Sequence, residues 1–301
     1  MLNVPKTWLV VAAPAVFVLL WSTGFVGARA AMPHADSMVF LGQRFFLSAV
    51  LLVLAHLILR QHWPRQIGFY GHQAIVGCLL HAGYLGGVFS AIKLGMPAGL
   101  SALIVGLQPL LTVVLAVWWL REDVTAKQWL GVIVGFVGLL MVLSDTGLAG
   151  GWTPSAPDAP VAIALCVVAL FGISIATIYQ KRYCAGAPLL SGACVQYVAA
   201  SAVCFAFAVG TQRLAIEYTF QLTLAMVWLV IVLSVVAVLL LNFLIQRGAA
   251  ASVASLFYLV PPLSALEAWW LFDETVGAQG IAGMVVVAAA VFLVMQPKQR
   301  S

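Results

Sequence analysis

Residues 109–131 read PLLTVVLAVWWLREDVTAKQWLG, and residues 261–283 read PPLSALEAWWLFDETVGAQGIAG. The second stretch repeats the pattern of the first 152 positions later, as the matching residues Pro109 and Pro261 show. Similarity at a fixed spacing indicates an internal duplication. Because both copies are dominated by apolar residues, the duplicated unit is typical of a membrane protein.

The composition of the whole chain supports the same class. Of its 301 residues, 64% are hydrophobic and 8% are charged, and the mean hydropathy is +1.10, which excludes an ordinary soluble domain. The net charge of +5 does not indicate nucleic-acid binding, because the longest basic run is Lys181-Arg182. We expect neither disulfides nor a metal, since no metal-type spacing links the five cysteines, Cys78, Cys166, Cys184, Cys194 and Cys204.

Apolar runs between charged residues and Pro/Gly breaks predict ten membrane-spanning helices. Their approximate bounds are 8–31, 36–59, 71–92, 98–120 and 128–144, then 159–180, 187–210, 223–245, 249–272 and 279–296. The first run exceeds the 7–15 apolar residues of a signal-peptide core, so we expect it to remain as a span. The Gly- and Pro-rich break from Asp145 to Ala159 separates five spans from five. We therefore predict a first repeat (1–145), a linker (146–158) and a second repeat (159–301).

An odd number of spans in each repeat gives the two halves opposite orientations in the membrane. Short cytoplasmic loops are enriched in Lys and Arg; with the N-terminus inside, ten cations lie on the cytoplasmic side and three on the other. We therefore predict two inverted five-helix repeats with both termini cytoplasmic. The cytoplasmic set is Lys6, Arg60, Arg65, Arg121, Lys127, Lys181, Arg182, Arg247, Lys298 and Arg300, and the opposite set is Arg29, Lys93 and Arg213.

Four stretches carry a resemblance to a known family: Trp21–Phe25, Gln43–Phe45, Ala98–Gly131 and Ala250–Gly283. On these residues the chain resembles the drug/metabolite transporter superfamily, specifically a duplicated EamA-type exporter, from about Trp8 to Met295. The resemblance implies an all-α protein of the inner or plasma membrane, without a cofactor, that exports amino acids, other metabolites or lipophilic drugs. The amino-acid exporter branch is the one it resembles most.

Arg44 is the costliest residue of the predicted spans, because a charge at the bilayer centre costs at least about 2.5 kcal/mol and marks a partner or a pathway. It lies about eight residues, or about 12 Å, below the outer surface. In one interpretation Arg44 binds a substrate carboxylate; in the other it extends outward or pairs with backbone carbonyls. The residue at the same place in the second half is the neutral Gln196.

Two other ionisable residues fall within predicted spans. Glu267 lies about five residues below the outer surface, where it binds a substrate ammonium, carries a coupled proton, or merely forms an ion pair or a headgroup contact. His81 lies near the middle of the third span, with Tyr84 one turn further on and therefore on a similar face. His81 either responds to substrate and protons or hydrogen-bonds a neighbouring helix.

Three further polar or aromatic residues share a depth near the midplane, where transporter sites form between the two halves: Trp21, Gln108 and Tyr258. Large rings with one polar group suit a cavity for apolar or zwitterionic solutes, because ring faces attract ammonium groups. Ordinary helix packing explains any one of them equally simply.

Pro109 in the first half, and Pro261 and Pro262 in the second, interrupt backbone hydrogen bonding at equivalent places in mid-membrane. A transporter needs matching points at which helices bend to open one side or the other. We therefore predict that these prolines act as hinges.

The leading hypothesis is a secondary transporter that exports amino acids and related small amphipathic metabolites by alternating access around a midplane cavity. The first alternative is a multidrug or lipophilic-cation exporter. A passive channel or an intramembrane enzyme is less favoured, because the spans carry isolated polar residues, and no HExxH or GxSxG motif occurs. No P-loop is present for ATP coupling; proton coupling and oligomeric state stay open.

Overall fold

The computed structural model describes residues 6–96, 101, 104–145, 157–247, 250–260, 262–264, 266–267 and 277–295. The regular secondary structure of these residues is helical, and the β pairing among them is one isolated bridge between Ala35 and Ile216. The all-α prediction is therefore confirmed for the described part of the chain.

The helices follow the predicted apolar runs. In the first half they are α1 (Lys6–Ala31), α2 (Ser37–Ile58), α3 (Ile67–Gly77) continued by a π-helical stretch η1 (Cys78–Leu85) and α4 (Gly86–Lys93), α6 (Gln108–Leu115) with η2 (Ala116–Leu120), and α7 (Ala126–Asp145). In the second half they are α8 (Ala159–Tyr183), α9 (Leu189–Gly210), α10 (Phe220–Trp228) continued by the π-helical η3 (Leu229–Ala237) and α11 (Val238–Arg247), α12 (Ala250–Ser255) with the 3-10 turn η4 (Leu256–Leu259), and α14 (Ala278–Met295).

Six of the described helical segments are long and apolar enough to cross a membrane. The remaining apolar helices, such as Gln108–Leu120, are shorter within the described residues, so the full count of ten spans stays a prediction. The six segments are Ala12–Ala31, Ser37–Ile58, Ile67–Lys93, Ala159–Tyr183, Leu189–Gly210 and Phe220–Arg247.

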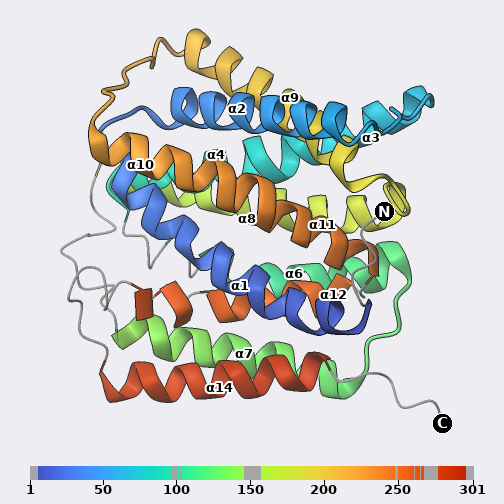
Figure 1. Cartoon of the computed structure of the whole chain (residues 1–301). Helices are drawn as coiled ribbons and strands as arrows, with labels where there is room; N and C mark the ends of the chain where they lie inside the picture. The colour runs from blue at the N-terminus through green and yellow to red at the C-terminus, as the bar shows by residue number, and fades with distance from the viewer. Residues whose placement is uncertain are drawn as a thin grey trace.

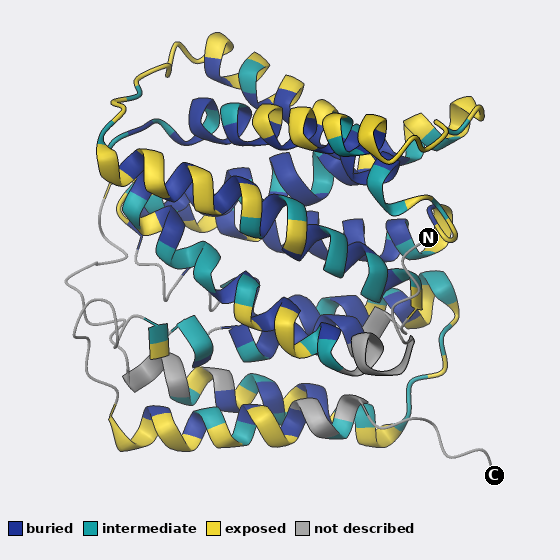
Figure 2. Cartoon of the chain, viewed as in Figure 1, coloured by how far each residue is buried: buried dark blue, intermediate teal, exposed yellow. Residues whose placement is uncertain are grey.

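The helices lie side by side in one bundle (Figure 1). At one side α7 packs along α14, and at the opposite side α2 packs along α9. Buried residues line the helix faces that point into the bundle, and exposed ones face outward (Figure 2). The fully buried large side chains include Tyr197, Tyr258, Phe17, Phe40, Phe45 and Leu52.

Two unusual backbone features recur at the spacing of the sequence repeat. The π-helical stretches η1 and η3 end at Leu85 and Ala237, which are 152 positions apart. Arg60 and Gln212, also 152 positions apart, both adopt a left-handed conformation, with φ of 48° and 55°. A non-glycine residue with positive φ is uncommon, so matching positions in α2–α3 and α9–α10 loops are an independent sign of duplication.

A close helix crossing fixes α3 against α9. A Cβ atom added to Gly77 of α3 would lie 2.6 Å from the Cα of Gln196 on α9, and closer still to the carbonyl oxygen of Gln196. Only glycine allows the two backbones to approach this far. The crossing sets the position of Gln196, whose amide lies in the bundle interior.

Two loops at one end of the bundle are joined by backbone hydrogen bonds. The amide of Asp36, after α1, donates to the carbonyl of Ala215, after α9, at 2.8 Å. The amide of Glu217 donates to the carbonyl of His34 at 2.8 Å, and the Asp36 carboxylate accepts from the Ala215 amide at 3.1 Å. These bonds place the α1–α2 and α9–α10 loops at the same end.

Candidate functional site

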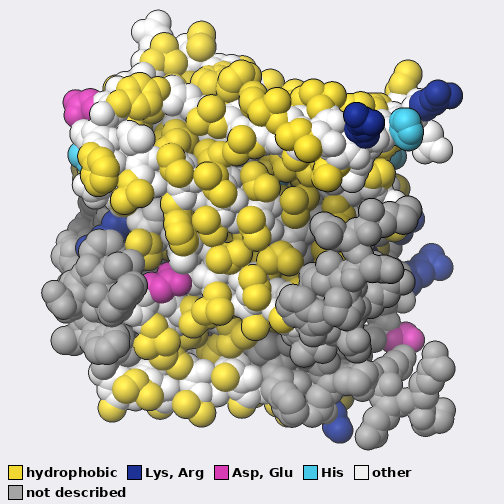
Figure 3. Space-filling view, viewed as in Figure 1, with side chains coloured by type: hydrophobic (Ala, Val, Ile, Leu, Met, Phe, Trp, Pro, Cys, Tyr) yellow, Lys and Arg dark blue, Asp and Glu magenta, His cyan; other side chains and the backbone are white. Residues whose placement is uncertain are grey.

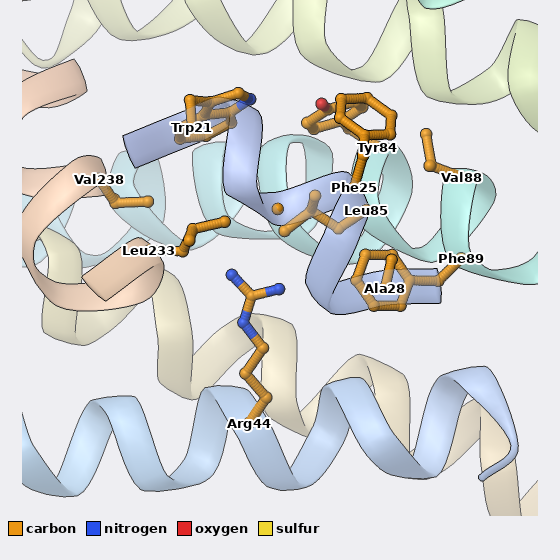
Figure 4. A pocket seen from close by; sticks show the side chains of 11 residues that line it. Trp21, Phe25, Ala28, Arg44, Tyr84, Leu85, Val88, Phe89, Leu233 and Val238 are labelled. Atoms are coloured by element: carbon orange, nitrogen blue, oxygen red, sulfur yellow. The ribbon is translucent and has the colours of Figure 1, made fainter. Parts of the chain in front are cut away.

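A small cavity lies in the bundle where four helical segments meet (Figure 4). It measures about 20 Å³ in the space open to the centre of a water molecule, and one buried water needs about 10–15 Å³ on that scale. Aromatic and aliphatic side chains form most of its wall. They come from α1 (Trp21, Gly24, Phe25, Ala28), from η1 and α4 (Tyr84, Leu85, Val88, Phe89), and from η3 and α11 (Leu233, Val238), with Arg44 from α2.

Arg44 is the charged group of this wall. Its side chain is 2% exposed and extends from α2 toward the cavity (Figure 4), rather than outward to a membrane surface. Its Nε donates a hydrogen bond to Ser234 Oγ of η3 at 2.9 Å, whereas its buried Nη1 has no hydrogen-bond partner. A buried guanidinium nitrogen without a partner is costly, so an anionic group in the cavity would satisfy it.

A stack of rings supports Arg44 from behind. The guanidinium carbon lies 5.7 Å from the centre of the Phe45 ring. Phe45 stacks on Tyr197 of α9 at 5.6 Å, and Tyr197 donates its hydroxyl hydrogen to the backbone carbonyl of Ser234 at 2.6 Å. The ring stack and Ser234 therefore hold the guanidinium at one place, which limits the freedom it would lose on binding a ligand.

His81 belongs to this stack but is not part of the cavity wall. Its ring stacks on Tyr197 with the ring centres 4.4 Å apart and is fully buried. The Gln196 amide lies beside the ring, but neither ring nitrogen makes a hydrogen bond of good geometry. Gln196 instead donates from Nε2 to Gln73 Oε1 at 2.7 Å.

Trp21 and Tyr84 are the large polar aromatics of the cavity. Both are buried, and the Trp21 indole is within hydrogen-bonding reach of the Tyr84 hydroxyl. The Trp21 ring packs against Phe17 at 5.1 Å and edge-on against Phe257 at 5.5 Å. These contacts fix the indole in one orientation.

Glu267 contacts α1 at Ser22 and is not part of the cavity wall. The hydroxyl of Ser22, the residue after Trp21, hydrogen-bonds to Glu267 Oε1, and the hydroxyl of Ser264 donates to the carbonyl of Ser22 at 3.0 Å. The buried Glu267 Oε2 has no hydrogen-bond partner. The carboxyl group therefore retains an acceptor for an ammonium group or a proton.

The structure does not bring Gln108 and Tyr258 to the cavity wall. Gln108 is fully buried and donates from Nε2 to Thr112 Oγ1 at 3.1 Å, while its Oε1 has no partner. Tyr258 is also fully buried, and its hydroxyl donates to the carbonyl of Val132 on α7 at 2.9 Å. This bond ties η4 to α7, so packing accounts for Tyr258.

Of the predicted hinge prolines, Pro109 lies at a helix boundary. Pro109 is in the first turn of α6, where its missing N–H leaves no helical bond unmade. The interruption itself is the turn at Gly106 and Leu107. Pro262 is buried and helical, and Pro261 lies outside the described residues. The hinge role stays a prediction.

Sequence reasoning missed two residues that organise the site, Ser234 and Tyr197. Ser234 is a lone hydroxyl within the apolar run of the predicted eighth span, and that isolation was the available signal. Tyr197 lies 152 positions after Phe45, the ring it stacks on. Comparison of the two halves position by position would have directed attention to this pair.

The apolar helices and the buried charge beside an internal cavity define a multi-pass membrane protein. A model of the EamA-like transporter family matches residues 7–144 and, separately, residues 160–296. The chain belongs to the EamA-like transporter family, and it is a multi-pass transporter of the cell membrane. Its family indicates a transporter rather than an enzyme.

Two relatives are distant in sequence but match nearly the whole chain. An uncharacterized inner membrane transporter of Escherichia coli strain K12 is 26% identical over 92% of this chain and 87% of its own length. A probable amino-acid metabolite efflux pump of Salmonella typhimurium is 25% identical over 92% of this chain and 91% of its own. One solved crystal structure shares the fold with a TM-score of 0.76 and 21% identity, covering 94% of this chain and 95% of that one.

Proposed function

We propose that the protein is a secondary transporter that exports amino acids and related small amphipathic metabolites by alternating access around the cavity at Arg44. The observation that carries the proposal is the buried Arg44 Nη1, which has no hydrogen-bond partner beside a cavity with aromatic walls. The name of the Salmonella relative, an amino-acid metabolite efflux pump, favours the same substrate class.

The chemistry of the wall suits a zwitterion. A guanidinium binds a carboxylate through charge-assisted, often paired hydrogen bonds. The ring faces of Trp21 and Tyr84 attract an ammonium group. Glu267, whose Oε2 has no hydrogen-bond partner, contacts Ser22, the residue after Trp21 on α1. The remaining wall is apolar, so it favours an apolar substituent over a charged one.

Several features support two inverted halves, residues 1–145 and 159–301, joined by the linker 146–158. Three described helices pack on their own counterparts in the other half: α2 on α9, α6 on α12 and α7 on α14. The first helix of each half instead packs on the third helix of the other half: α1 on α10 and η3, and α8 on α3 and η1. This exchange of counterparts is the pattern that a two-fold axis between the halves produces. The Lys and Arg side chains in view gather mainly at one end of the bundle (Figure 3), as cytoplasmic termini would require.

Binding an amino acid in this site requires the bundle to open. The cavity holds only about 20 Å³, whereas small-molecule sites measure about 300–1,000 Å³. The stretches η1 and η3 contribute wall residues and are π-helical, and such distortions often mark functional positions. We infer that bending at these stretches and at Pro109 and Pro262 opens one end while the other stays closed.

Transport by purified protein in liposomes tests the proposal. We expect labelled amino acids inside the liposomes to exchange with unlabelled amino acids outside, because a carrier reorients with substrate bound. A channel gives net flux without such counterflow. Counterflow of cationic dyes with none of any amino acid would favour the lipophilic-cation exporter, and no flux of either class would contradict secondary transport of these solutes.

The variant Glu267→Gln tests whether transport is coupled to protons. If the carboxyl group exchanges a proton against substrate, Glu267→Gln should flatten the pH dependence of transport while preserving counterflow at one fixed pH. The matched control is Glu217→Gln, which changes an exposed acid in the α9–α10 loop. A pH profile identical to that of the wild type in Glu267→Gln would exclude the coupled-proton role.

A further inference from the structure

A second, larger hollow lies on the outside of the bundle, between α2 and α10. It encloses about 390 Å³, within the range of about 300–1,000 Å³ typical of small-molecule sites. Its apolar wall includes Leu47, Met226 and Val227, and its polar wall consists of Gln43, Tyr218 and Thr223. We call it the α2/α10 groove.

The groove opens toward the membrane rather than toward water. Both of its helices belong to the six segments long and apolar enough to cross a bilayer. Side chains around it point outward, since Phe46 is 56% exposed and Val227 is 50% exposed. The face of the molecule that carries α2 and α10 is covered mostly by hydrophobic side chains (Figure 3).

A hollow at this place must be filled by an apolar group. Water finds few hydrogen bonds among apolar walls, and an empty space forfeits the packing contacts of its lining. Bilayer lipid is the most abundant apolar material at a membrane-facing surface. An acyl chain also suits a space whose walls are apolar side chains of two membrane-spanning helices.

The polar end of the groove distinguishes a lipid from other apolar occupants. Tyr218 lies in the loop just before α10, where Tyr residues meet the headgroup layer. Its hydroxyl donates to Gln43 Oε1 at 2.9 Å, so two polar side chains meet at this end of the groove. An ester carbonyl of a glycerolipid can accept a hydrogen bond from the Gln43 amide.

We propose that the α2/α10 groove binds one glycerolipid, with an acyl chain along Leu47 and Met226 and an ester group at Gln43 and Tyr218. The groove and the Arg44 cavity both take wall residues from α2. Gln43 faces the groove while the next residue, Arg44, hydrogen-bonds to Ser234 on the inner side. The same helix contributes Met226 to the groove and, two turns later, Leu233 to the cavity.

Lipid retention by the purified full chain tests this proposal without reference to transport. After detergent exchange, native mass spectrometry should find a phospholipid bound to the wild type. Leu47→Trp fills the groove and should lower that bound fraction at least about tenfold, equivalent to about 1.4 kcal/mol. The control Val203→Trp places the same ring at an exposed position on α9 and should leave retention unchanged. Equal retention in the two variants would overturn the proposal.

A second measurement locates the lipid. A phospholipid with a photoreactive group on its acyl chain should label residues 43–47 or 222–227 in the wild type, and this labelling should fall in Gln43→Leu. Labelling spread evenly over the outer helix faces would contradict a defined site. A disulfide-linked dimer formed by Val227→Cys, and absent from the wild type, would show that a second copy of the chain occupies the groove instead.

Discussion

Arg44→Gln should lower counterflow of amino acids by at least about 30-fold, because loss of one partner of a buried, charged hydrogen-bonded pair costs about 2–5 kcal/mol. The glutamine keeps a hydrogen-bonding group toward Ser234 but removes the charge that faces the cavity. Membrane insertion should persist, since a neutral amide is cheaper to bury than a guanidinium. Initial rates of exchange in liposomes, normalised to inserted protein, measure the effect.

Two companion variants separate recognition from general damage. Arg44→Lys keeps the charge but loses the planar, paired donors, so its rate should fall between those of Arg44→Gln and the wild type. Arg65→Gln removes an exposed cation from the α2–α3 loop and should exchange at the rate of the wild type. A wild-type rate in Arg44→Gln would show that the guanidinium only stabilises the fold.

Gly77→Ala should produce the largest loss of stability. The new Cβ would lie 2.6 Å from the Cα of Gln196, where only backbone shifts can relieve the clash. Overpacking of this kind costs about 1–3 kcal/mol and occasionally more. Separation of α3 from α9 would also displace the Gln73–Gln196 hydrogen bond and the ring of His81. We expect a lower apparent Tm in detergent, measured by intrinsic fluorescence.

Gly71→Ala is the matched control on the same helix. A Cβ at Gly71 would meet no atom within 4 Å, and alanine in a helix is favoured over glycine by about 1 kcal/mol. The apparent Tm should therefore stay the same or rise slightly. A similar Tm for Gly77→Ala and Gly71→Ala would contradict the close crossing of α3 and α9.

The sequence predicted the helical class and most helix bounds, because apolar length is the strongest constraint that a bilayer imposes. Predicted spans 36–59 and 187–210 correspond to Ser37–Ile58 and Leu189–Gly210. The π-helical stretches were not predictable, since their residues, such as Leu229 and Val230, fit an α-helix equally well by hydropathy. The predicted fourth span (98–120) did not anticipate the turn at Gly106 and Leu107 that precedes α6, because hydropathy does not register such a turn.

The site was predicted in part. Trp21 and Arg44 were selected by chemistry and depth, and Tyr84 by its place one turn after His81; all three contribute to the cavity wall. Depth alone also selected Tyr258, whose hydroxyl is taken by the Val132 carbonyl, since depth carries no information on which face of a helix meets which neighbour. Ser234 was not predicted for the same reason, because its role depends on the hydrogen bond from Arg44 of α2, which no local sequence pattern encodes.

The most direct test of the central claim compares an amino acid with its own amide. The amide keeps the ammonium group and the side chain but lacks the carboxylate that Arg44 is proposed to bind. In liposomes containing the wild-type protein, the amino acid with the highest flux should exchange at least about tenfold faster than its amide, since tenfold corresponds to about 1.4 kcal/mol of lost recognition. The preference should vanish in Arg44→Gln. Equal exchange of acid and amide by the wild type would contradict carboxylate recognition at the Arg44 cavity.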